Sequence, residues 1–214
     1  MLYMISDLHA DYTLEGLQEY IRIGGADDLL LILGDVGLKF QATEANRKFD
    51  EYFMAIDKPI AIVDGNHENH PYLRSFPVEE LYGGPVYRLT DNIVCLQRGN
   101  VYEIEGKSFF VMGGCKSSQR WHDMGLLYEF EDPSEEEIAL AYKNLAARGN
   151  KVDYVLTHKY KVIDGELRPN SIEELTRYIN SSVEFKKWFS GHWHKNKDID
   201  ELHTVVYDKA YRLE

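Results

Sequence analysis

The chain has 214 residues, of which 44% are hydrophobic and 13% aromatic, and its formal net charge is −12. This composition suits a single packed domain over residues 1–214 and excludes a disordered chain, and no apolar run is long enough for a membrane helix. The negative charge disfavours nucleic-acid binding through a basic face, because such binding neutralises phosphates with Lys and Arg side chains.

The start of the chain and its two cysteines favour a cytoplasmic location. No basic segment with a cleavable apolar segment precedes the first apolar residues, so we expect no signal peptide. Cys95 and Cys115 form neither a disulfide framework nor a metal-binding spacing. Each follows an apolar run, and we interpret both as small buried hydrophobic residues in a reducing compartment.

Residues 1–63 predict an alternation of short apolar strands and helices. Strands are expected at residues 2–5, 29–33 and 60–63, and helices at residues 13–22 and 42–56. Short, mostly apolar strands joined by helices indicate a parallel sheet that is covered on both faces.

The middle of the chain predicts antiparallel pairing. Short strands separated by turn-forming residues are expected at residues 86–88, 93–96, 101–104 and 109–112. Such close spacing is typical of hairpins. A long polar loop over residues 115–133 follows, and loops of this length in a compact domain are often functional.

The last part of the chain returns to alternating helices and strands. Helices ending near residues 148 and 179 each begin with a capping-box pattern, at Ser134 and at Ser171. Strands are expected at residues 152–156, 185–189 and 202–207. The whole pattern predicts an α/β fold with two sheets.

Side chains that can bind a metal follow five of the apolar strands. Five of the eight histidines take part, and the full set is Asp7, His9, Asp35, Asn66, His67, His158, His192 and His194. In open α/β sheets the functional crevice lies beyond the carboxyl ends of the strands, so these groups can converge. Each taken alone could be an ordinary turn, helix cap or core histidine, whereas together they predict a metal or phosphate site.

The order of these groups resembles the calcineurin-like metallophosphoesterases, and in particular their small bacterial and phage members. The matching blocks are Asp7-Leu8-His9, Gly34-Asp35, Gly65-Asn66-His67-Glu68, Thr157-His158 and Gly191-His192-Trp193-His194. The resemblance implies a four-layer αββα sandwich, in which two mixed β-sheets pack face to face and helices flank them.

The resemblance also implies a centre with two divalent metal ions. Asp7, His9 and His194 would bind one ion, and Asp35 would bridge it to the second. The remaining ligands of the second ion would be Asn66, His158 and His192. Imidazole, carboxylate and amide donors suit manganese, which is the first expectation, and also iron, zinc or nickel.

The implied reaction is hydrolysis of a phosphomonoester or phosphodiester through in-line attack by a metal-bridging hydroxide. His67 would protonate or stabilise the leaving oxygen, and Asp35 would be the second catalytic residue. The Ser/Thr phosphatase branch has an Asp that orients this His, but Leu38 occupies that position here. The chain therefore does not resemble that branch, and Asp64 or Glu68 are the candidates to orient His67.

The segment Lys116 to His122 is the candidate substrate wall. Arg120 could clamp a phosphate and Trp121 could stack on an aromatic leaving group. The alternative is a solvated loop anchored by one aromatic residue. We interpret His70 and His203 as structural residues.

Two other functions stay open from the sequence. A DNA or RNA nuclease on the same fold would use the same chemistry, although the acidic charge disfavours it. A non-catalytic scaffold would show missing ligands, whereas all the positions are intact here. The expected partner is a small phosphoester, and the sequence leaves its identity and the oligomeric state open.

Overall fold

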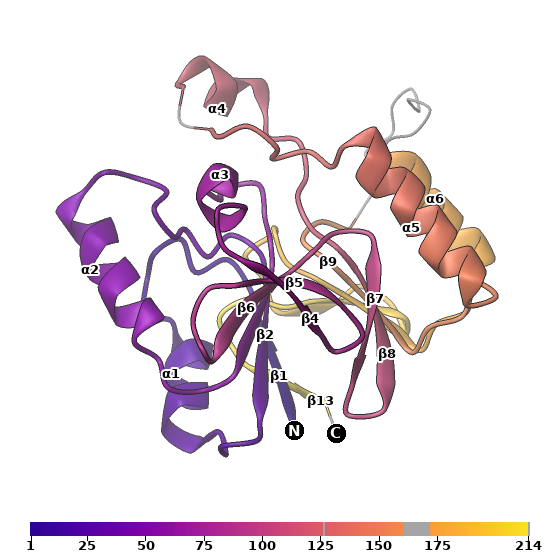
Figure 1. Ribbon diagram of the computed structural model, residues 1–214, viewed down its shortest axis with the longest axis horizontal. Coiled ribbons are helices and arrows are strands. Elements are labelled where there is room, and N and C mark those ends of the chain that lie inside the picture. The colour runs from indigo at the N-terminus through magenta and orange to yellow at the C-terminus, as the bar shows by residue number, and fades with distance from the viewer. Residues whose placement is uncertain (126, 161–171, 214) are drawn as a thin grey trace.

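The structure is a computed structural model that describes residues 1–125, 127–160 and 172–213 (Figure 1). Two β-sheets lie in the centre and helices lie on their outer sides. The two ends of the chain lie at the bottom of this view, and the short helices α3 (His70–Leu73) and α4 (Gln119–Asp123) lie at the top.

The first sheet has its parallel strands in the middle and antiparallel strands at its edges. Its described order is β13 (Tyr211–Leu213), β1 (Leu2–Ile5), β2 (Leu29–Leu33), β3 (Ile60–Val63), β6 (Ile93–Leu96), β5 (Gly84–Arg88) and β4 (Val78–Leu81). Strands β1, β2, β3 and β6 are mutually parallel and completely buried, which explains their continuous apolar sequences.

The second sheet is also mixed. Its described order is β11 (Lys197–Asp198), β12 (His203–Val205), β10 (Lys187–Ser190), β9 (Tyr154–Thr157), β8 (Lys107–Met112) and β7 (Asn100–Ile104). Strands β8, β9, β10 and β12 run parallel, whereas β7 and β11 pair antiparallel with their neighbours.

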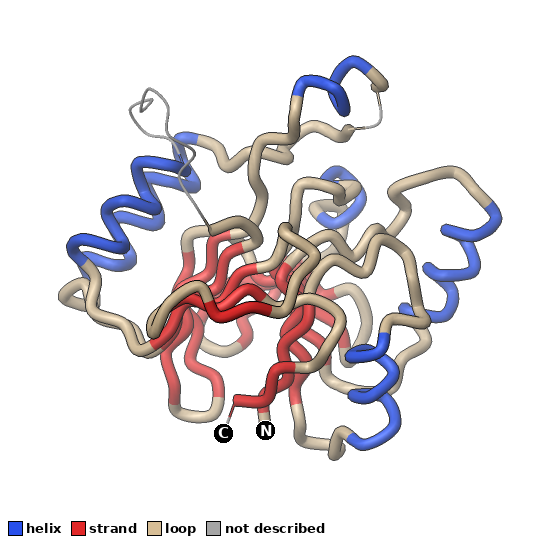
Figure 2. The backbone as a smooth tube through the Cα atoms, turned by 180° about the vertical axis from the view of Figure 1, so that it is seen from behind, coloured by secondary structure: helices blue, strands red, loops and turns tan. Residues whose placement is uncertain are grey.

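Four longer helices cover the outer faces of the sheets (Figure 2). They are α1 (Glu15–Ile23) and α2 (Glu44–Met54) on the first sheet, and α5 (Glu135–Ala147) and α6 (Ile172–Ser182) on the second. The expected capping box at Ser134 is present, since the Ser134 side chain accepts a hydrogen bond from the backbone N–H of Glu137 and the Glu137 carboxylate accepts one from the backbone N–H of Ser134. The one expected at Ser171 lies outside the described residues.

Three apolar cores separate the four layers. The central core lies between the sheets and includes Met4 and Leu31 from one sheet and Phe109 and Phe189 from the other. The other two cores lie between each sheet and its helices. The expected four-layer αββα sandwich is therefore confirmed.

Several elements differ from the sequence-based expectation. The strands β6 and β7 were expected as neighbours in one run of hairpins, but they belong to different sheets. The chain crosses from the first sheet to the second within residues 97–99. Apolar spacing and turn signals reveal that a strand exists, but they do not reveal which sheet it joins.

Short edge strands and short helices were missed. Strands β4 and β11 are largely exposed and lack an apolar pattern, and β13 is only three residues long. Helix α4 occupies part of residues 115–133, which we expected to be a loop. The strands near the end of the chain are Lys187–Ser190 and His203–Val205, a shift from the expected 185–189 and 202–207.

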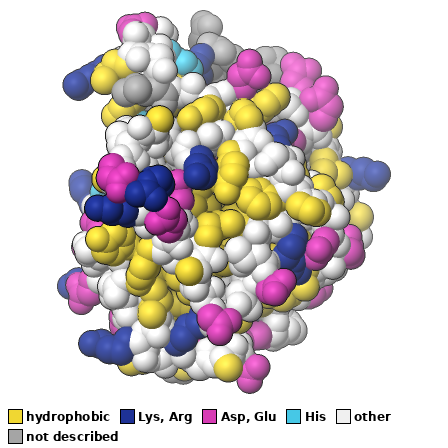
Figure 3. All heavy atoms as spheres, turned by 60° about the vertical axis from the view of Figure 1, so that its left-hand side comes forward, with side chains coloured by type: hydrophobic (Ala, Val, Ile, Leu, Met, Phe, Trp, Pro, Cys, Tyr) yellow, Lys and Arg dark blue, Asp and Glu magenta, His cyan; other side chains and the backbone are white. Residues whose placement is uncertain are grey.

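The described surface carries mixed charge. On the face drawn in Figure 3, acidic and basic side chains are interleaved with apolar ones. None of the helices in the described part of the chain is long and apolar enough to cross a lipid bilayer.

Candidate metal centre

The candidate ligands all follow parallel strands of the two sheets. Asp7 and His9 follow β1, Asp35 follows β2 and Asn66 follows β3. From the second sheet, His158 follows β9, and both His192 and His194 follow β10. The carboxyl ends of these strands meet at one edge of the sandwich, and the structure brings the seven side chains together there.

Asp7, His9 and His194 form the first group of ligand atoms. The Nε2 atoms of the two histidines are 2.9 Å apart, and Asp7 Oδ1 is 3.3 Å from His194 Nε2 and 3.9 Å from His9 Nε2. Asp7 Oδ1 is buried and has no hydrogen-bond partner among the described residues. A buried carboxylate oxygen without a donor is unfavourable, so this group fits a bound cation.

Asn66, His158 and His192 form the second group. Asn66 Oδ1 is 3.0 Å from His158 Nε2, which in turn is 3.3 Å from His192 Nδ1. His158 Nδ1 lies 2.8 Å from the carbonyl oxygen of Leu33, and a proton on Nδ1 would leave Nε2 free as a ligand. The amide nitrogen of Asn66 donates to Ser117 Oγ, which turns the amide oxygen toward the histidines.

Asp35 lies between the two groups. Its Oδ2 atom is 3.7 Å from His9 Nε2 and 3.4 Å from His158 Nε2. Its Oδ1 atom accepts a hydrogen bond of 2.7 Å from the backbone N–H of His67. The carboxylate of Asp35 thus lies near side chains of both groups.

The backbone at the site is strained. Asp7, His9, Asp35, His192 and His194 all have positive φ angles, between 45° and 69°. Residues other than glycine rarely adopt this conformation, and such residues cluster at functional sites because the surrounding structure holds them there.

Two glycines allow the backbone to approach the carboxylates closely. A Cβ atom at Gly65 would lie 2.1 Å from Asp35 Oδ1, and one at Gly191 would lie 1.8 Å from Ser6 Oγ and 2.8 Å from Asp7 Oδ2. Glycine is therefore required at both positions for the ligands to reach one another.

Burial and charge set the protonation of the histidines in the second group. Burial alone would lower the pKa of His158, but the Asp35 carboxylate raises it to about 9. Burial and the neighbouring charge of His158 lower the pKa of His192 to about 4. The Asp35 carboxylate thus favours the protonated form of His158, whereas burial favours the neutral form of His192.

A family model described as calcineurin-like phosphoesterase matches residues 2–196, which include all of these ligand atoms. The chain belongs to the calcineurin-like phosphoesterase family. Metal-dependent hydrolysis of phosphoesters is therefore its general chemistry, and the phosphoesterase offers clustered ligands for the metal.

Solved structures with low sequence identity resemble the phosphoesterase. A phosphopantetheinyl hydrolase from Mycobacterium tuberculosis is 18% identical, covering 96% of this chain and 89% of that one with a TM-score of 0.41. A protein of unknown function from Aquifex aeolicus is 16% identical, covering 86% and 87%, with a TM-score of 0.36. No curated protein matches the phosphoesterase.

In the phosphoesterase, His67 lies at the mouth of the centre among aromatic rings. Its ring centroid is 4.8 Å from that of Trp121, 5.5 Å from Phe40 and 5.6 Å from His9. Burial lowers the pKa of His67, although the Asp35 carboxylate acts in the opposite direction. His67 is therefore largely neutral at pH 7 and still carries one ring N–H.

Neither candidate carboxylate orients the His67 ring. Asp64 accepts hydrogen bonds from the Arg98 guanidinium at 2.5 and 2.9 Å. Glu68 accepts hydrogen bonds from the backbone N–H groups of Val36 and Gly37. Among the described contacts, neither carboxylate bonds to His67. Ring packing and the backbone bond to Asp35 hold His67 instead.

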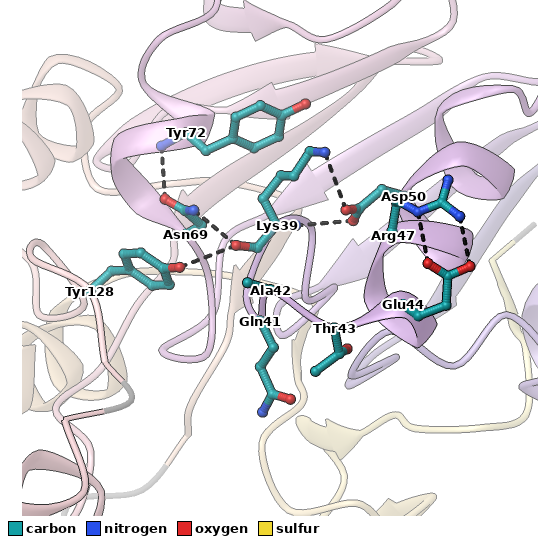
Figure 4. A pocket seen from close by; sticks show the side chains of 10 residues that line it. All are labelled: Lys39, Gln41, Ala42, Thr43, Glu44, Arg47, Asp50, Asn69, Tyr72 and Tyr128. Carbon is teal, nitrogen blue, oxygen red and sulfur yellow. Dashed lines mark hydrogen bonds and ion pairs between the residues drawn. The ribbon is translucent and has the colours of Figure 1, made fainter.

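A cavity of about 260 Å³ opens beside His9 and His67. Phe40 and Trp121 are among its apolar walls, whereas Arg120 is not among its lining residues. A neighbouring cavity of about 590 Å³ is lined by Lys39, Tyr72 and Tyr128 among others (Figure 4). Its Lys39 and Arg47 pair with carboxylates, so these cations are already neutralised.

The remaining histidines have structural contacts. His70 is buried and lies 3.3 Å from Asp64, and His203 contacts Asp200 while its ring stacks on Tyr160. His122, which the sequence left open, lies 2.9 Å from Glu131.

The sequence placed Ser117 in the candidate substrate wall but did not identify it as a partner of Asn66, and it did not identify Phe40. Ser117 acts through Asn66 from a distance of 51 residues along the chain, and Phe40 follows Gly34-Asp35 without any spacing that marks it. Only the folded arrangement reveals such residues.

Proposed function

We propose that the chain hydrolyses small phosphoesters with two divalent cations bound at this centre. Asp7, His9 and His194 would hold one cation, with Asp35 shared between the two. Asn66, His158 and His192 would hold the other. The observation that carries the proposal is the unpartnered, buried Asp7 Oδ1, which faces two imidazole Nε2 atoms.

Bound cations would polarise the phosphoryl oxygens and would lower the pKa of a bound water molecule to about 7. The mixed nitrogen and oxygen ligands suit manganese, iron, zinc or nickel. Hydrogen bonds within the chain fix the positions of two of these ligands. The Asp35 carboxylate accepts one from the backbone N–H of His67, and the Nδ1 atom of His158 lies against the carbonyl oxygen of Leu33.

The imidazole of His67 would stabilise or protonate the leaving oxygen. His67 lines the cavity and directly follows Asn66 in the sequence, so a ring N–H of His67 could donate to a substrate bound there. The aromatic walls Phe40 and Trp121 would exclude water from the leaving group and stack on a flat one. We also propose that Arg120, on helix α4, contacts the phosphate of the substrate.

A small substrate is favoured over nucleic acid. The cavity beside His67 holds about 260 Å³, and the net charge of the chain is −12. A groove that follows a nucleic-acid backbone depends on a run of basic side chains. On the drawn face, basic side chains alternate with acidic ones (Figure 3).

The test is hydrolysis of p-nitrophenyl phosphate and bis-p-nitrophenyl phosphate by metal-free protein reloaded with Mn²⁺, Ni²⁺, Zn²⁺ or Mg²⁺. We expect turnover that depends on the metal and that Asp35→Asn abolishes. The preferred ester then separates a monoesterase from a diesterase. Turnover that persists in Asp35→Asn, or a protein that binds no divalent cation, would contradict the proposal.

A further inference from the structure

The thiol of Cys115 lies beside the second group of ligands. Its Sγ atom is 3.3 Å from Asn66 Oδ1 and 3.9 Å from His192 Nδ1. Sγ, His158 Nε2 and a ring nitrogen of His192 all lie within 4.8 Å of one another. Cys115 is only 1% exposed, so the sulfur faces this group of donors rather than solvent.

The separations fit donors around one ion. Zinc bonds of about 2.3 Å to sulfur and about 2.0 Å to nitrogen or oxygen place neighbouring ligand atoms roughly 2.8–3.5 Å apart. The distances from Asn66 Oδ1 to Cys115 Sγ and to His158 Nε2, 3.3 and 3.0 Å, lie in this range. The 3.3 Å between His158 and His192 does too, whereas the 3.9 Å from Cys115 Sγ to His192 Nδ1 is longer.

The backbone before Cys115 packs closely against the loop that carries Asn66. Gly114 has a φ of +70° and its N–H donates to the carbonyl oxygen of Asp64, two residues before the ligand Asn66. A Cβ atom at Gly113 would lie 2.0 Å from Asp64 Oδ1. The end of β8 is therefore fastened to the loop that presents Asn66, which fixes the sulfur relative to the amide oxygen.

The other cysteine has a different environment. Cys95 is part of the apolar core between the first sheet and its helices, and its polar contact is the carbonyl oxygen of Leu96 at 3.9 Å. Cys115 belongs to none of the three apolar cores of the described residues. Both cysteines are buried, as the sequence predicts, but only Cys95 belongs to one of the three apolar cores of the described residues, whereas Cys115 also contacts polar side chains.

We propose that Cys115 is an additional ligand of the second cation, a proposal that rests on the two-cation function above. On binding, the thiol proton leaves to solvent and the sulfur takes the place beside Asn66, His158 and His192. A thiolate donor favours soft and borderline cations such as zinc over manganese or magnesium. The second position would thus select zinc, while the first, with carboxylate and imidazole donors, has no such bias.

The test uses Co²⁺ as a spectroscopic substitute for zinc in the metal-free protein. A cobalt–thiolate bond gives an intense charge-transfer absorption in the near ultraviolet, whereas imidazole and carboxylate ligands give only weak visible bands. We expect the charge-transfer band in the wild type and in the matched control Cys95→Ala. Cys115→Ala and Cys115→Ser should lose the band while they keep the weak visible bands.

A second readout is the ratio of zinc to manganese affinity from competition titrations. Loss of the sulfur should lower this ratio by about tenfold or more in Cys115→Ala, with no change in Cys95→Ala. Circular dichroism establishes that each variant is folded.

The outcomes distinguish a failure of the Cys115 proposal from a failure of the two-cation function. Two bound cobalt ions without a charge-transfer band in the wild type would overturn the role of Cys115 and leave the two-cation function intact. A folded wild type that binds no cobalt would overturn both. A band that persists in Cys115→Ala would also overturn the role of Cys115.

Discussion

His67 is the residue whose chemistry is easiest to isolate, because it contacts the centre without belonging to either group of ligands. Replacing it by Ala should leave both groups in place. We expect His67→Ala to lose about 10²–10⁴-fold in kcat while it retains the bound metal, as measured by steady-state kinetics and elemental analysis.

The leaving group provides the control for this prediction. A p-nitrophenolate leaves without much help, whereas an alkoxide requires a proton, so the loss in His67→Ala should be larger for an alkyl phosphate. An equal loss for both esters, or loss of metal together with activity, would show that His67 has a structural role.

At the residue scale, the sequence marks the candidate ligands, which the structure brings together, but it gives little sign of the residues that contact them. Asp7, Asn66 and His192 stand in short blocks whose spacing marks them. No spacing marks Ser117 and Cys115. Both follow strand β8 and contact Asn66 from about fifty residues further along the chain. Positive φ angles at the ligands also follow from tertiary constraint rather than from local preference.

At the scale of elements, the turn after β10 depends on Gly191. We expect Gly191→Ala to displace His192 and to reduce metal affinity, because the added Cβ would lie 1.8 Å from Ser6 Oγ in the neighbouring loop. Overpacking of this kind costs about 1–3 kcal/mol of unfolding free energy. Urea unfolding and isothermal titration with metal would measure the two effects.

Gly25→Ala is the matched control for that substitution. The atoms nearest to its Cβ would belong to Asp28, at ordinary distances of 3.4 Å or more, and Gly25 lies beyond the end of α1, outside both groups of ligands. Unchanged metal affinity in Gly191→Ala would mean that the turn relaxes without moving the histidines.

The elements themselves could be predicted where burial imposes a pattern. Strands β1, β2 and β3 are continuous apolar runs because both of their faces are covered. The edge strand β11, Lys197–Asp198, buries neither side chain, so no periodicity marks it. The assignment of β6 and β7 to separate sheets depends on long-range pairing that the local sequence does not encode.

At the scale of the whole molecule, a buried ion network joins the sheets where the chain crosses between them. Arg98 is 4% exposed and contacts Asp64 after β3 and Glu137 on α5. Arg98→Met would leave the buried Asp64 carboxylate with His70 as its remaining ion-pair partner among the described residues. We expect a loss of about 3–5 kcal/mol in unfolding free energy, measured by urea denaturation.

The double variant tests the cause of that loss. If an unpaired charge is responsible, Asp64→Asn combined with Arg98→Met should recover part of the stability that Arg98→Met alone loses. A double variant that is less stable by the sum of both single losses would contradict this account.

Acid stability should depend in part on Asp153, which joins the start of β9 to β8. The Lys186 ammonium and the Ser108 N–H and hydroxyl hold the pKa of Asp153 at about 2, below its ordinary value of 3.8. Because the folded pKa is depressed, the stabilisation is present above pH 4 and is lost as the pH falls toward 2.

The variant Asp153→Asn lacks this titration. Its stability deficit relative to the wild type should therefore shrink between about pH 4 and pH 2, as followed by urea unfolding at several pH values. A deficit that is constant over this range would mean that packing, rather than charge, makes Asp153 stabilising.

Both groups of candidate ligands combine residues from both sheets, and this affects when a cation can bind during folding. The first group combines Asp7 and His9 from one sheet with His194 from the other, and the second combines Asn66 with His158 and His192. The complete set of seven candidate ligands is therefore assembled only when the two sheets pack together, and its last member is His194. We therefore expect hydrolytic activity only after the sandwich has formed, and we expect bound metal to stabilise the folded protein by about 2.7 kcal/mol at a hundredfold excess of free metal over Kd.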